Sequence, residues 1–276
     1  MFWQKKPKKP KPKTQTVKPV SPTPKPLNPS PPVKPKPEKP VKKVDSRKEF
    51  LRIFKQLTYR HNSWNVWQDF VVMAACALSN PVDKEHYDGR EALYMKTIKR
   101  YSKQEQSLFP ELFAQTVMAL EDNPEQDFLG GIFMELNLGN DAKGQIFTPY
   151  HVCQFMAAIS MDNVCAEVKE KGYITIHDPC CGAGATLIAG IHEAKKQLKK
   201  ENMNFQNHVL IAAQDIDSTV ALMCYIQLSL LGIAGYVKIG NSLTEPITDK
   251  DSTENYWFTP MYFSKVWSLR RIFHNE

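Results

Sequence analysis

The chain has 276 residues, enough for one sizeable domain or two small ones, and its residue types are unevenly distributed. Residues 1–44 hold 13 of the 20 prolines and 13 lysines, with Glu38 as their only acid, so the net charge of +7 becomes −5 for residues 45–276. This distribution excludes a generally basic, nucleic-acid-binding body, and any basic groove in the folded part must be local.

Residues 1–44 contain hardly any large apolar side chains, so they cannot bury enough surface to offset chain entropy. We therefore expect a disordered tail. Its Lys-Pro pattern, as in residues 35–37, favours the extended polyproline II conformation. Such a tail suits a loose electrostatic contact with phosphate groups as well as a plain linker, and the pattern leaves both open.

The cysteines point to neither a metal site nor a secreted protein. Six are present, without a CxxC pair and without histidine spacing suited to zinc. The sequence has no signal peptide and no apolar run of about 18 residues. We therefore expect a cytoplasmic protein with reduced thiols, no bound metal and no membrane segment.

Apolar residues recur at helical spacing from Ser46 onwards, as in Phe50, Phe54 and Leu57. Similar stripes continue to Leu138, and Gly139-Asn140 is a typical helix stop. Because aromatic stripes at this spacing usually form a core, the pattern predicts a helical subdomain over residues 45–143.

The pattern then changes to short apolar runs that alternate with helical stretches. The runs are Tyr173 to His177, His208 to Ala213 and Tyr236 to Ile239. This alternation predicts an α/β fold with a parallel sheet over residues 144–276, whose ligands bind at the carboxyl ends of the strands.

A glycine-containing turn follows the first of these strands. Gly182 and Gly184 lack a Cβ where the chain turns sharply, so a cofactor can approach the backbone there. Asp178, at the strand end, offers an acceptor for a cationic group. A dinucleotide fingerprint would need a third glycine near Leu187, which is missing. A tight turn without a ligand has the same pattern.

A second carboxylate lies at the end of the next predicted strand. Asp215 stands where a ribose hydroxyl pair would need an acceptor. Asp217 precedes Ser218 and Thr219 and is better placed to cap the helix Val220 to Leu231. We therefore predict a binding role for Asp215 and a structural role for Asp217.

Four segments together resemble the γ-class adenine-N6 DNA methyltransferases. In chain order they are Gly-Gln-Ile-Phe-Thr-Pro at 144–149, Asp-Pro-Cys-Cys-Gly-Ala-Gly at 178–184, Gln-Asp-Ile-Asp at 214–217 and Gly-Asn-Ser-Leu at 240–243. The nearest relatives in pattern are modification subunits of type I restriction systems and their phage or mobile-element counterparts. The resemblance covers about residues 127–243 and includes the helix that begins at Asp127.

The resemblance implies a Rossmann-like sheet that binds S-adenosylmethionine. The implied cofactor-binding residues are Gln145, Phe147, Thr148, Pro149, Asp178, Cys181, Gly182, Gly184, Asp215 and Asn241. The Phe-Thr-Pro segment also suits a helix entry, with Thr148 as cap and Pro149 at the first helical position, and both roles are compatible. Asn241 stands where the family usually has Asp, and it can still hydrogen-bond a base edge.

The acceptor end of the pocket departs from the family pattern. The family holds a flipped adenine with Asn-Pro-Pro followed by Tyr or Phe, and this sequence has no such tetrapeptide. The candidate is Thr259-Pro260-Met261-Tyr262, in which Thr259, Pro260 and Tyr262 would be the catalytic residues. The threonine offers one hydroxyl in place of an amide carbonyl, and a core strand and turn would have the same pattern.

The sequence ends at Glu276, before the remaining strands and a target-recognition domain that the family would have. We therefore expect an incomplete sheet, or one completed by a separate specificity or completing subunit. Residues 261–273 predict an amphipathic closing helix, with an aromatic face for the core or for a partner. Its arginines, Arg270 and Arg271, suit a phosphate contact equally well.

The resemblance implies a DNA adenine-N6 methyltransferase that transfers the methyl group directly, by orienting the reacting atoms. The alternative is a catalytically degenerate relative that serves a mobile element as a cofactor- or DNA-binding scaffold. A methyltransferase for RNA or protein is disfavoured by the segment 145–149. A plain α/β domain with an unidentified nucleotide ligand is the minimal interpretation.

Overall fold

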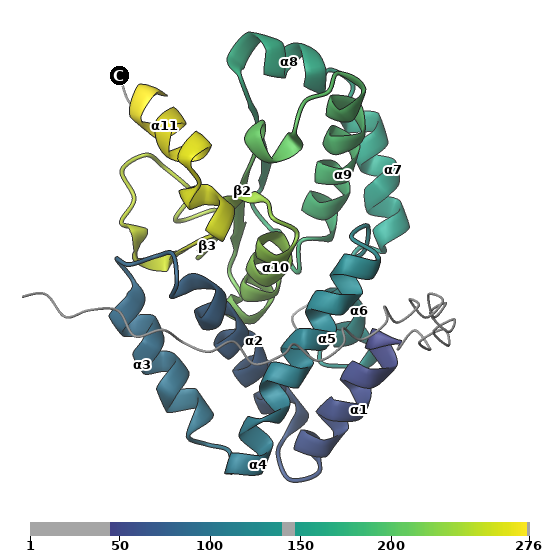
Figure 1. Cartoon of the computed structure of the whole chain (residues 1–276), viewed down its shortest axis with the longest axis vertical. Helices are drawn as coiled ribbons and strands as arrows, with labels where there is room; N and C mark the ends of the chain where they lie inside the picture. Colours follow the sequence, from purple (N-terminus) through teal and green to yellow (C-terminus); the bar gives the residue numbers. More distant parts are fainter. Residues whose placement is uncertain (1–44, 140–146, 275–276) are drawn as a thin grey trace, which may run out of the picture. The chain divides into compact units, whose positions relative to one another are not determined.

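The computed structural model describes residues 45–139 and 147–274, drawn in colour in Figure 1. Within these residues the first half is entirely helical, as the apolar spacing predicted. Its helices are α1 Ser46–Thr58, α2 Ser63–Ser79, α3 Tyr87–Ile98, α4 Lys103–Gln106, α5 Leu108–Asp122 and α6 Phe128–Glu135. The tail, residues 1–44, and the predicted boundary at residues 143 and 144 lie outside the described residues.

Helix α1 shows how the aromatic stripes are used. Phe50, Phe54 and Leu57 recur on one face and are all buried. The ring of Phe50 contacts Trp67 and Phe70 of α2, with ring centroids 6.0 and 5.4 Å away. Aromatic pairs at this separation add to the free energy of folding beyond their buried area. The stripes therefore form the core of the helical half, in agreement with the sequence pattern.

The second half is built on a four-stranded sheet in the order β1-β2-β3-β4. The strands are β1 Ile174–Asp178, β2 Val209–Asp215, β3 Ala234–Ile239 and β4 Tyr256–Phe258. The helices are α7 Tyr150–Ser160, α8 Val164–Lys171, α9 Ala185–Lys200, α10 Ser218–Leu230 and α11 Lys265–His274. Short 3-10 helices are η2 Phe205–Asn207, η3 Thr253–Asn255 and η4 Pro260–Phe263.

Strand direction gives the sheet two different edges. Because β1, β2 and β3 are parallel, their carboxyl ends lie at one edge, which we call the carboxyl edge. Strand β4 pairs antiparallel with β3, with Phe258 opposite Tyr236. It therefore ends at the opposite edge, where β3 begins, which we call the amino edge. The predicted α/β fold with a parallel, Rossmann-like sheet is confirmed for the first three strands.

Helix α10 lies between the sheet and the helical half (Figure 1). It packs against α2 and α6 on one side and against β3 on the other. Every residue from Thr219 to Leu228 is buried, as expected of a helix with packed neighbours all round. The described residues of the two halves thus form one compact unit.

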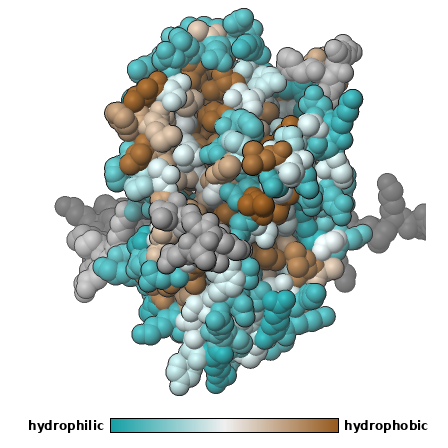
Figure 2. Space-filling view, turned by 180° about the vertical axis from the view of Figure 1, so that it is seen from behind, coloured by the Kyte–Doolittle hydropathy of each residue, from teal (hydrophilic) through white to brown (hydrophobic). Residues whose placement is uncertain are grey.

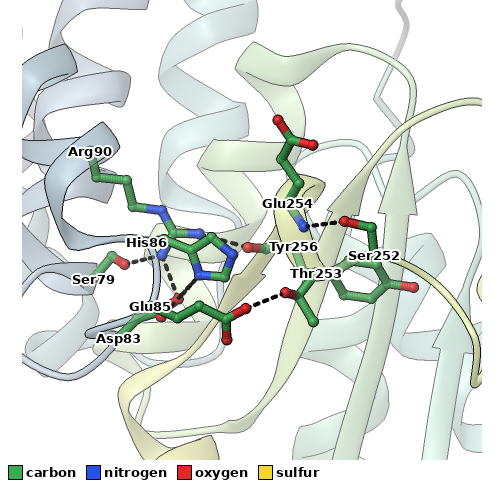
Figure 3. Close-up of polar contacts among 9 residues, drawn as sticks. All are labelled: Ser79, Asp83, Glu85, His86, Arg90, Ser252, Thr253, Glu254 and Tyr256. Atoms are coloured by element: carbon green, nitrogen blue, oxygen red, sulfur yellow. Dashed lines mark hydrogen bonds and ion pairs between the residues drawn. The ribbon is translucent and has the colours of Figure 1, made fainter.

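The edge strand β4 is held by a buried arginine from α3 (Figure 3). Arg90 donates to Asp83 at 2.6 Å and to the carbonyl of Tyr256 at 2.6 Å, and its guanidinium lies 4.0 Å from the ring centre of Trp257. Burial alone would raise the pKa of Asp83, but hydrogen bonds from His86 and Arg90 outweigh it and lower that pKa. The network fixes β4 against the helical half.

The closing helix predicted over residues 261–273 is shorter than expected. Residues 260–263 form η4, and α11 begins at Lys265. Both arginines bind backbone carbonyls, since Arg270 donates to Gly172 at 2.9 Å and Arg271 donates to Tyr262 at 2.7 Å. Trp267 is buried, so one face of the helix belongs to the core.

Apolar side chains are exposed on two helices of the second half. They are Val152, Phe155, Met156 and Ile159 of α7, and Leu269, Ile272 and Phe273 of α11. Figure 2 shows hydrophobic side chains as separate patches among hydrophilic ones. Among the helices described here, none is both long enough and apolar enough to cross a membrane.

Candidate functional site

The glycine turn after β1 needs glycine at two positions for different reasons. Gly182 and Gly184 both have positive φ, +52° and +96°, where other residues are strained. At Gly184 a Cβ would also lie 2.9 Å from the sulfur of Cys224 on α10, so space excludes a side chain. At Gly182 a Cβ would meet only the Phe147 ring, at 3.5 Å. At Gly182, therefore, the positive φ and not a lack of space requires glycine.

Asp178 shapes this turn from the end of β1. One carboxylate oxygen accepts the backbone N–H of Cys180 at 3.0 Å, and the other accepts the hydroxyl of Thr186 at the start of α9. Cys181 donates its N–H to the carbonyl of Gln214 at 2.9 Å and so ties the turn to β2. Asp178 thus keeps the turn in a fixed conformation beside the sheet.

Asp215 joins the end of β2 to the same turn. Its carboxylate accepts the N–H of Gly182 at 2.8 Å and that of Asp217 at 2.9 Å. Burial raises the pKa of Asp215, and these two hydrogen bonds only partly offset it. Asp217 caps α10 by accepting the N–H of Thr219 at 2.9 Å, which confirms its predicted structural role.

A cavity of about 320 Å³ opens beside the turn at the carboxyl edge. Its lining residues are Asp127, Phe147, Thr148, Met156, Asp178, Cys180, Cys181, Gly182, Ala183, Ala185 and Thr186. Five predicted binding residues therefore meet at one cavity, namely Phe147, Thr148, Asp178, Cys181 and Gly182. Gln145 lies outside the described residues. Pro149, Gly184, Asp215 and Asn241 are not among the residues that line the cavity.

The Phe-Thr-Pro segment enters α7 one residue later than expected. Pro149 is the N-cap and Tyr150 is the first helical residue, without a side-chain cap hydrogen bond. The predicted capping role of Thr148 is therefore wrong, and its side chain borders the cavity instead. Phe147 stacks on Phe133 of α6, with ring centroids 5.4 Å apart, and this contact holds the segment against the helical half.

Asn241 lies just beyond β3 at the same edge. Its side-chain oxygen accepts the N–H of Leu243 at 2.9 Å and so forms a local turn. The preceding Gly240 donates to the carbonyl of Asp215 at 2.9 Å. Asn241 is therefore positioned next to Asp215, although its side chain is partly used by the turn.

Asp127 is a cavity residue that the sequence did not single out. It caps α6 by accepting the N–H of Gly130 at 2.9 Å, and it also accepts the side-chain amide of Gln227 at 2.8 Å. A Cβ at Gly130 would overlap the Asp127 carboxylate, so this cap requires glycine. Burial raises the pKa of Asp127. The only sequence signal was that the family resemblance includes the helix beginning at Asp127, which does not reveal a binding role for this side chain.

Gln227 connects this cap to the glycine turn. Its amide nitrogen also donates to the carbonyl of Ala183 at 2.8 Å, and its amide oxygen accepts the N–H of Leu129 at 3.1 Å. The side chain is completely buried within α10. One amide therefore holds α6 and the turn together, which is why a residue of the helical half reaches the cavity.

The predicted acceptor residues lie elsewhere. Thr259 is completely buried at the amino edge, where its hydroxyl donates to the carbonyl of Ile233 at 2.7 Å and accepts the N–H of Gly235 at 3.1 Å. Gly235 is four positions before Ile239 at the carboxyl edge, which corresponds to about 13 Å along β3. The expected position of this segment beside the cavity is thus corrected, because β4 turns back along β3.

Pro260 and Tyr262 are also used structurally. Pro260 begins η4. The ring of Tyr262 stacks on Phe258 with centroids 4.8 Å apart, and the guanidinium of Arg271 lies 3.9 Å from the centre of the Tyr262 ring. Burial raises the pKa of Tyr262. The structure therefore does not bring Thr259, Pro260 or Tyr262 to the cavity.

Comparison with known proteins gives a family for the second half. The N-6 DNA methylase family matches residues 131–276, which is more than half of the chain. A search of curated protein sequences finds no match. One similar solved structure is a Listeria monocytogenes protein described as a class I S-adenosylmethionine-dependent methyltransferase, with 13% identity and a TM-score of 0.41. The similarity covers 74% of this chain and 56% of that protein, so the chain spans little more than half of its length.

Proposed function

We propose that this chain, which belongs to the N-6 DNA methylase family, binds S-adenosylmethionine at the carboxyl edge and acts in methylation of adenine N6 in DNA. The observation that carries the proposal is the cavity itself. Two carboxylates, Asp127 and Asp178, border it together with the glycine turn. The turn and the three parallel strand ends are features of nucleotide-type sites in α/β sheets.

The residues of the cavity fit the chemistry of this cofactor. S-adenosylmethionine carries an ammonium and a sulfonium group, and both suit a cavity bordered by carboxylates. Asp127 has a pKa raised by burial, and a cation beside it would stabilise the charged form. Gly182 leaves the backbone accessible, and Asp215 holds that glycine from the side of β2. We propose Asp127, Asp178, Thr148 and Gly182 as direct contacts.

When bound, S-adenosylmethionine supplies a methyl group on a sulfonium centre. The residues of this chain would hold and orient the cofactor and exclude water around it. Orientation of the reacting atoms is the main source of the rate in a direct transfer. Because the segment 259–262 lies at the amino edge, we expect the adenine to bind other residues. The family match favours methyl transfer over a scaffold that only binds the cofactor.

The test combines cofactor binding with methyl transfer. Calorimetry of the full chain with S-adenosylmethionine is expected to show binding that Asp178→Asn weakens at least about tenfold, or about 1.4 kcal/mol. The matched control is Asp88→Asn, at an exposed acid of α3, and it is expected to leave cofactor affinity unchanged. Labelled cofactor and mixed-sequence duplex DNA then report transfer to adenine.

The outcomes separate the alternatives. Label in adenine that Asp178→Asn lowers supports the proposal. If the chain binds the cofactor but no label appears in adenine, either by itself or with a co-encoded neighbouring subunit, the result would support a scaffold that binds the cofactor without methyl transfer. Absence of cofactor binding by the unaltered chain would refute both.

A further inference from the structure

One end of the helical half has an unusual concentration of positive charge. The end of α1 with the following residues, 52–60, and the end of α3 with the following turn, 96–103, contain seven basic and no acidic residues. The basic residues are Arg52, Lys55, Arg60, Lys96, Lys99, Arg100 and Lys103. Residues 45–276 together hold 23 basic and 28 acidic residues, so this cluster stands out from an acidic body. We call it the basic tip.

The two segments of the basic tip lie side by side, at the lower end of the molecule in Figure 1. His61, just after α1, lies 3.2 Å from Glu105 of α4, and its ring centre is 4.8 Å from that of Tyr101. An open groove of about 550 Å³ runs between them. Arg52, Lys55, Tyr59 and Arg60 line one side of it, and Ser102, Gln104 and Glu105 line the other. Hydrophilic side chains dominate this end in Figure 2.

Most of these charges lack an acidic partner within the described residues. Arg52 pairs with Glu49 at 2.6 Å, and Arg100 pairs with Asp69 at 2.7 Å. The acid nearest the groove, Glu105, accepts the N–H of Ser102 in a capping box at 2.8 Å. The remaining cations, Lys55, Arg60, Lys96, Lys99 and Lys103, are exposed and form no ion pair with a described acid. Several unpaired like charges close together repel one another, and a polyanion would relieve that repulsion.

A second run of lysines in the chain has a simpler explanation. Residues 195–200 close α9, where lysines interact favourably with the helix dipole. Acidic residues flank this run, since Lys196 pairs with Glu193 at 3.2 Å and Lys169 pairs with Glu201 at 2.9 Å. Lysines alone therefore do not define a site. The basic tip differs because it combines the ends of two helices, and only Arg52 and Arg100 of its seven cations pair with a described acid.

We propose that the basic tip binds the phosphate backbone of duplex DNA. Arg52, Lys55 and Arg60 line the groove, and the other cations of the tip are exposed on the neighbouring segment. Exposed Lys and Arg side chains grouped in this way are the usual means of holding a duplex without reading its sequence. Duplex DNA is the polyanion that the family description favours, so this inference rests on the proposed function and deepens it. The tip lies on the helical half, away from the carboxyl edge. It would position the duplex, while the cavity holds the cofactor.

The test compares two variants of the full chain with the same loss of charge. The tip variant is Lys55→Gln, Arg60→Gln, Lys99→Gln and Lys103→Gln. The control variant is Lys171→Gln, Lys196→Gln, Lys199→Gln and Lys200→Gln, on α8 and α9. Fluorescence anisotropy with a mixed-sequence duplex, repeated over a salt series, gives the affinity and its salt dependence. The N-terminal lysines are the same in both variants.

Each phosphate contact contributes about 0.9 to the slope of log affinity against log salt. We expect the tip variant to lose about 2 to 3.5 from this slope and at least about tenfold in affinity near 0.1 M salt. The control variant is expected to lose less than about threefold. Equal losses in the two variants, no loss in the tip variant, or tip-dependent binding of anionic phospholipid vesicles with no duplex binding would overturn the inference.

The two proposals fail separately. Cofactor affinity measured by calorimetry is expected to be the same in the tip variant as in the unaltered chain. Duplex binding that depends on the tip, without any label in adenine, would refute the proposed function and still support DNA binding by the basic tip. Methyl transfer together with duplex binding that the tip variant does not change would support the proposed function and refute DNA binding by the basic tip.

Discussion

The tripeptide Phe-Thr-Pro occurs twice in this chain, at 147–149 and at 258–260, and the two copies have opposite surroundings. In both, the phenylalanine stacks on another aromatic ring. Thr148, however, is exposed beside the cavity at the carboxyl edge. Thr259 is completely buried at the amino edge, and its hydroxyl makes two hydrogen bonds to the backbone.

The difference follows from strand direction and from what covers each edge. The first copy precedes the parallel strands and faces a glycine turn, so a ligand can approach it. The second follows an antiparallel strand that a buried arginine fixes in place. The first copy therefore has side chains available for binding, whereas the side chains of the second copy are already engaged in contacts within the fold. Sequence similarity to a motif carries function only where the topology leaves the side chains free.

The largest expected effect comes from releasing the strand that carries the second copy. Arg90→Met leaves Asp83 buried without its cation and the Tyr256 carbonyl without its donor. Breaking a buried ion pair from one side costs about 3–5 kcal/mol in the free energy of unfolding. Denaturant unfolding of the variant measures this loss. Arg52→Met, which removes an exposed pair with Glu49, is the control and should cost less than about 1 kcal/mol.

The second prediction compares the two threonines directly. Thr259→Val removes an acceptor from Gly235 and a donor from the Ile233 carbonyl, so it should lower the free energy of unfolding by about 1–3 kcal/mol. Thr148→Val should change stability by no more than about 0.5 kcal/mol, because its side chain is exposed. Calorimetry with the cofactor should give the opposite order, with Thr148→Val lowering cofactor affinity more than Thr259→Val does. Equal effects of the two variants on stability would show that the contrast is wrong.

The third prediction concerns the charge at the carboxyl edge. Asp127→Asn keeps the shape of the side chain and removes its charge, so cofactor affinity should fall about tenfold. The pH dependence tests the same group. Burial raises the pKa of Asp127 above its ordinary 3.8, against the hydrogen bonds from Gln227 and Gly130. The folded protein therefore holds this proton more tightly than the unfolded chain.

Because the pKa of Asp127 is higher in the folded protein than in the unfolded chain, its protonation stabilises the fold. This contribution is present below pH 3.8 and is lost as the pH rises through the folded pKa. The asparagine variant has no such loss. Relative to the unaltered protein without cofactor, it should gain stability as the pH rises above 3.8, as measured by unfolding at each pH. A difference between the two proteins that does not vary with pH would contradict the assignment.

The smallest effect is expected at the second copy's aromatic ring. Tyr262→Phe keeps the stacking on Phe258 and the contact with the Arg271 guanidinium. Stability should change by no more than about 0.5 kcal/mol, and cofactor binding and label transfer to DNA should be unaffected. Loss of transfer in a variant that still binds cofactor would restore Tyr262 as an acceptor residue and remove the contrast between the two edges.

The features predicted best from the sequence are those set by local pattern. The helical half, the three parallel strands and the cap at Asp217 all follow from apolar spacing and from a carboxylate placed before Thr219. The glycine turn was equally visible, since positive φ at Gly182 and Gly184 is a property of residue type. These predictions needed no information on distant contacts.

The features that the sequence could not give depend on contacts between distant segments. Strand β4 is only three residues long, and it is held in place by Arg90, which lies 166 residues before Tyr256. Asp127 reaches the cavity because Gln227, 100 residues later, holds it there. A capping aspartate and a buried glutamine have ordinary local patterns, so neither revealed a binding residue in the sequence.

Helix α10 has a consequence for how this chain folds. Its residues from Thr219 to Leu228 are buried on every side, between the helical half and the sheet. The second half produced alone would expose the side of α10 that packs against α2 and α6, and the helical half alone would expose the surfaces of α2 and α6 that α10 covers. Both would be prone to aggregate. The described region is therefore expected to melt in a single cooperative step, without a stage in which one half survives the other.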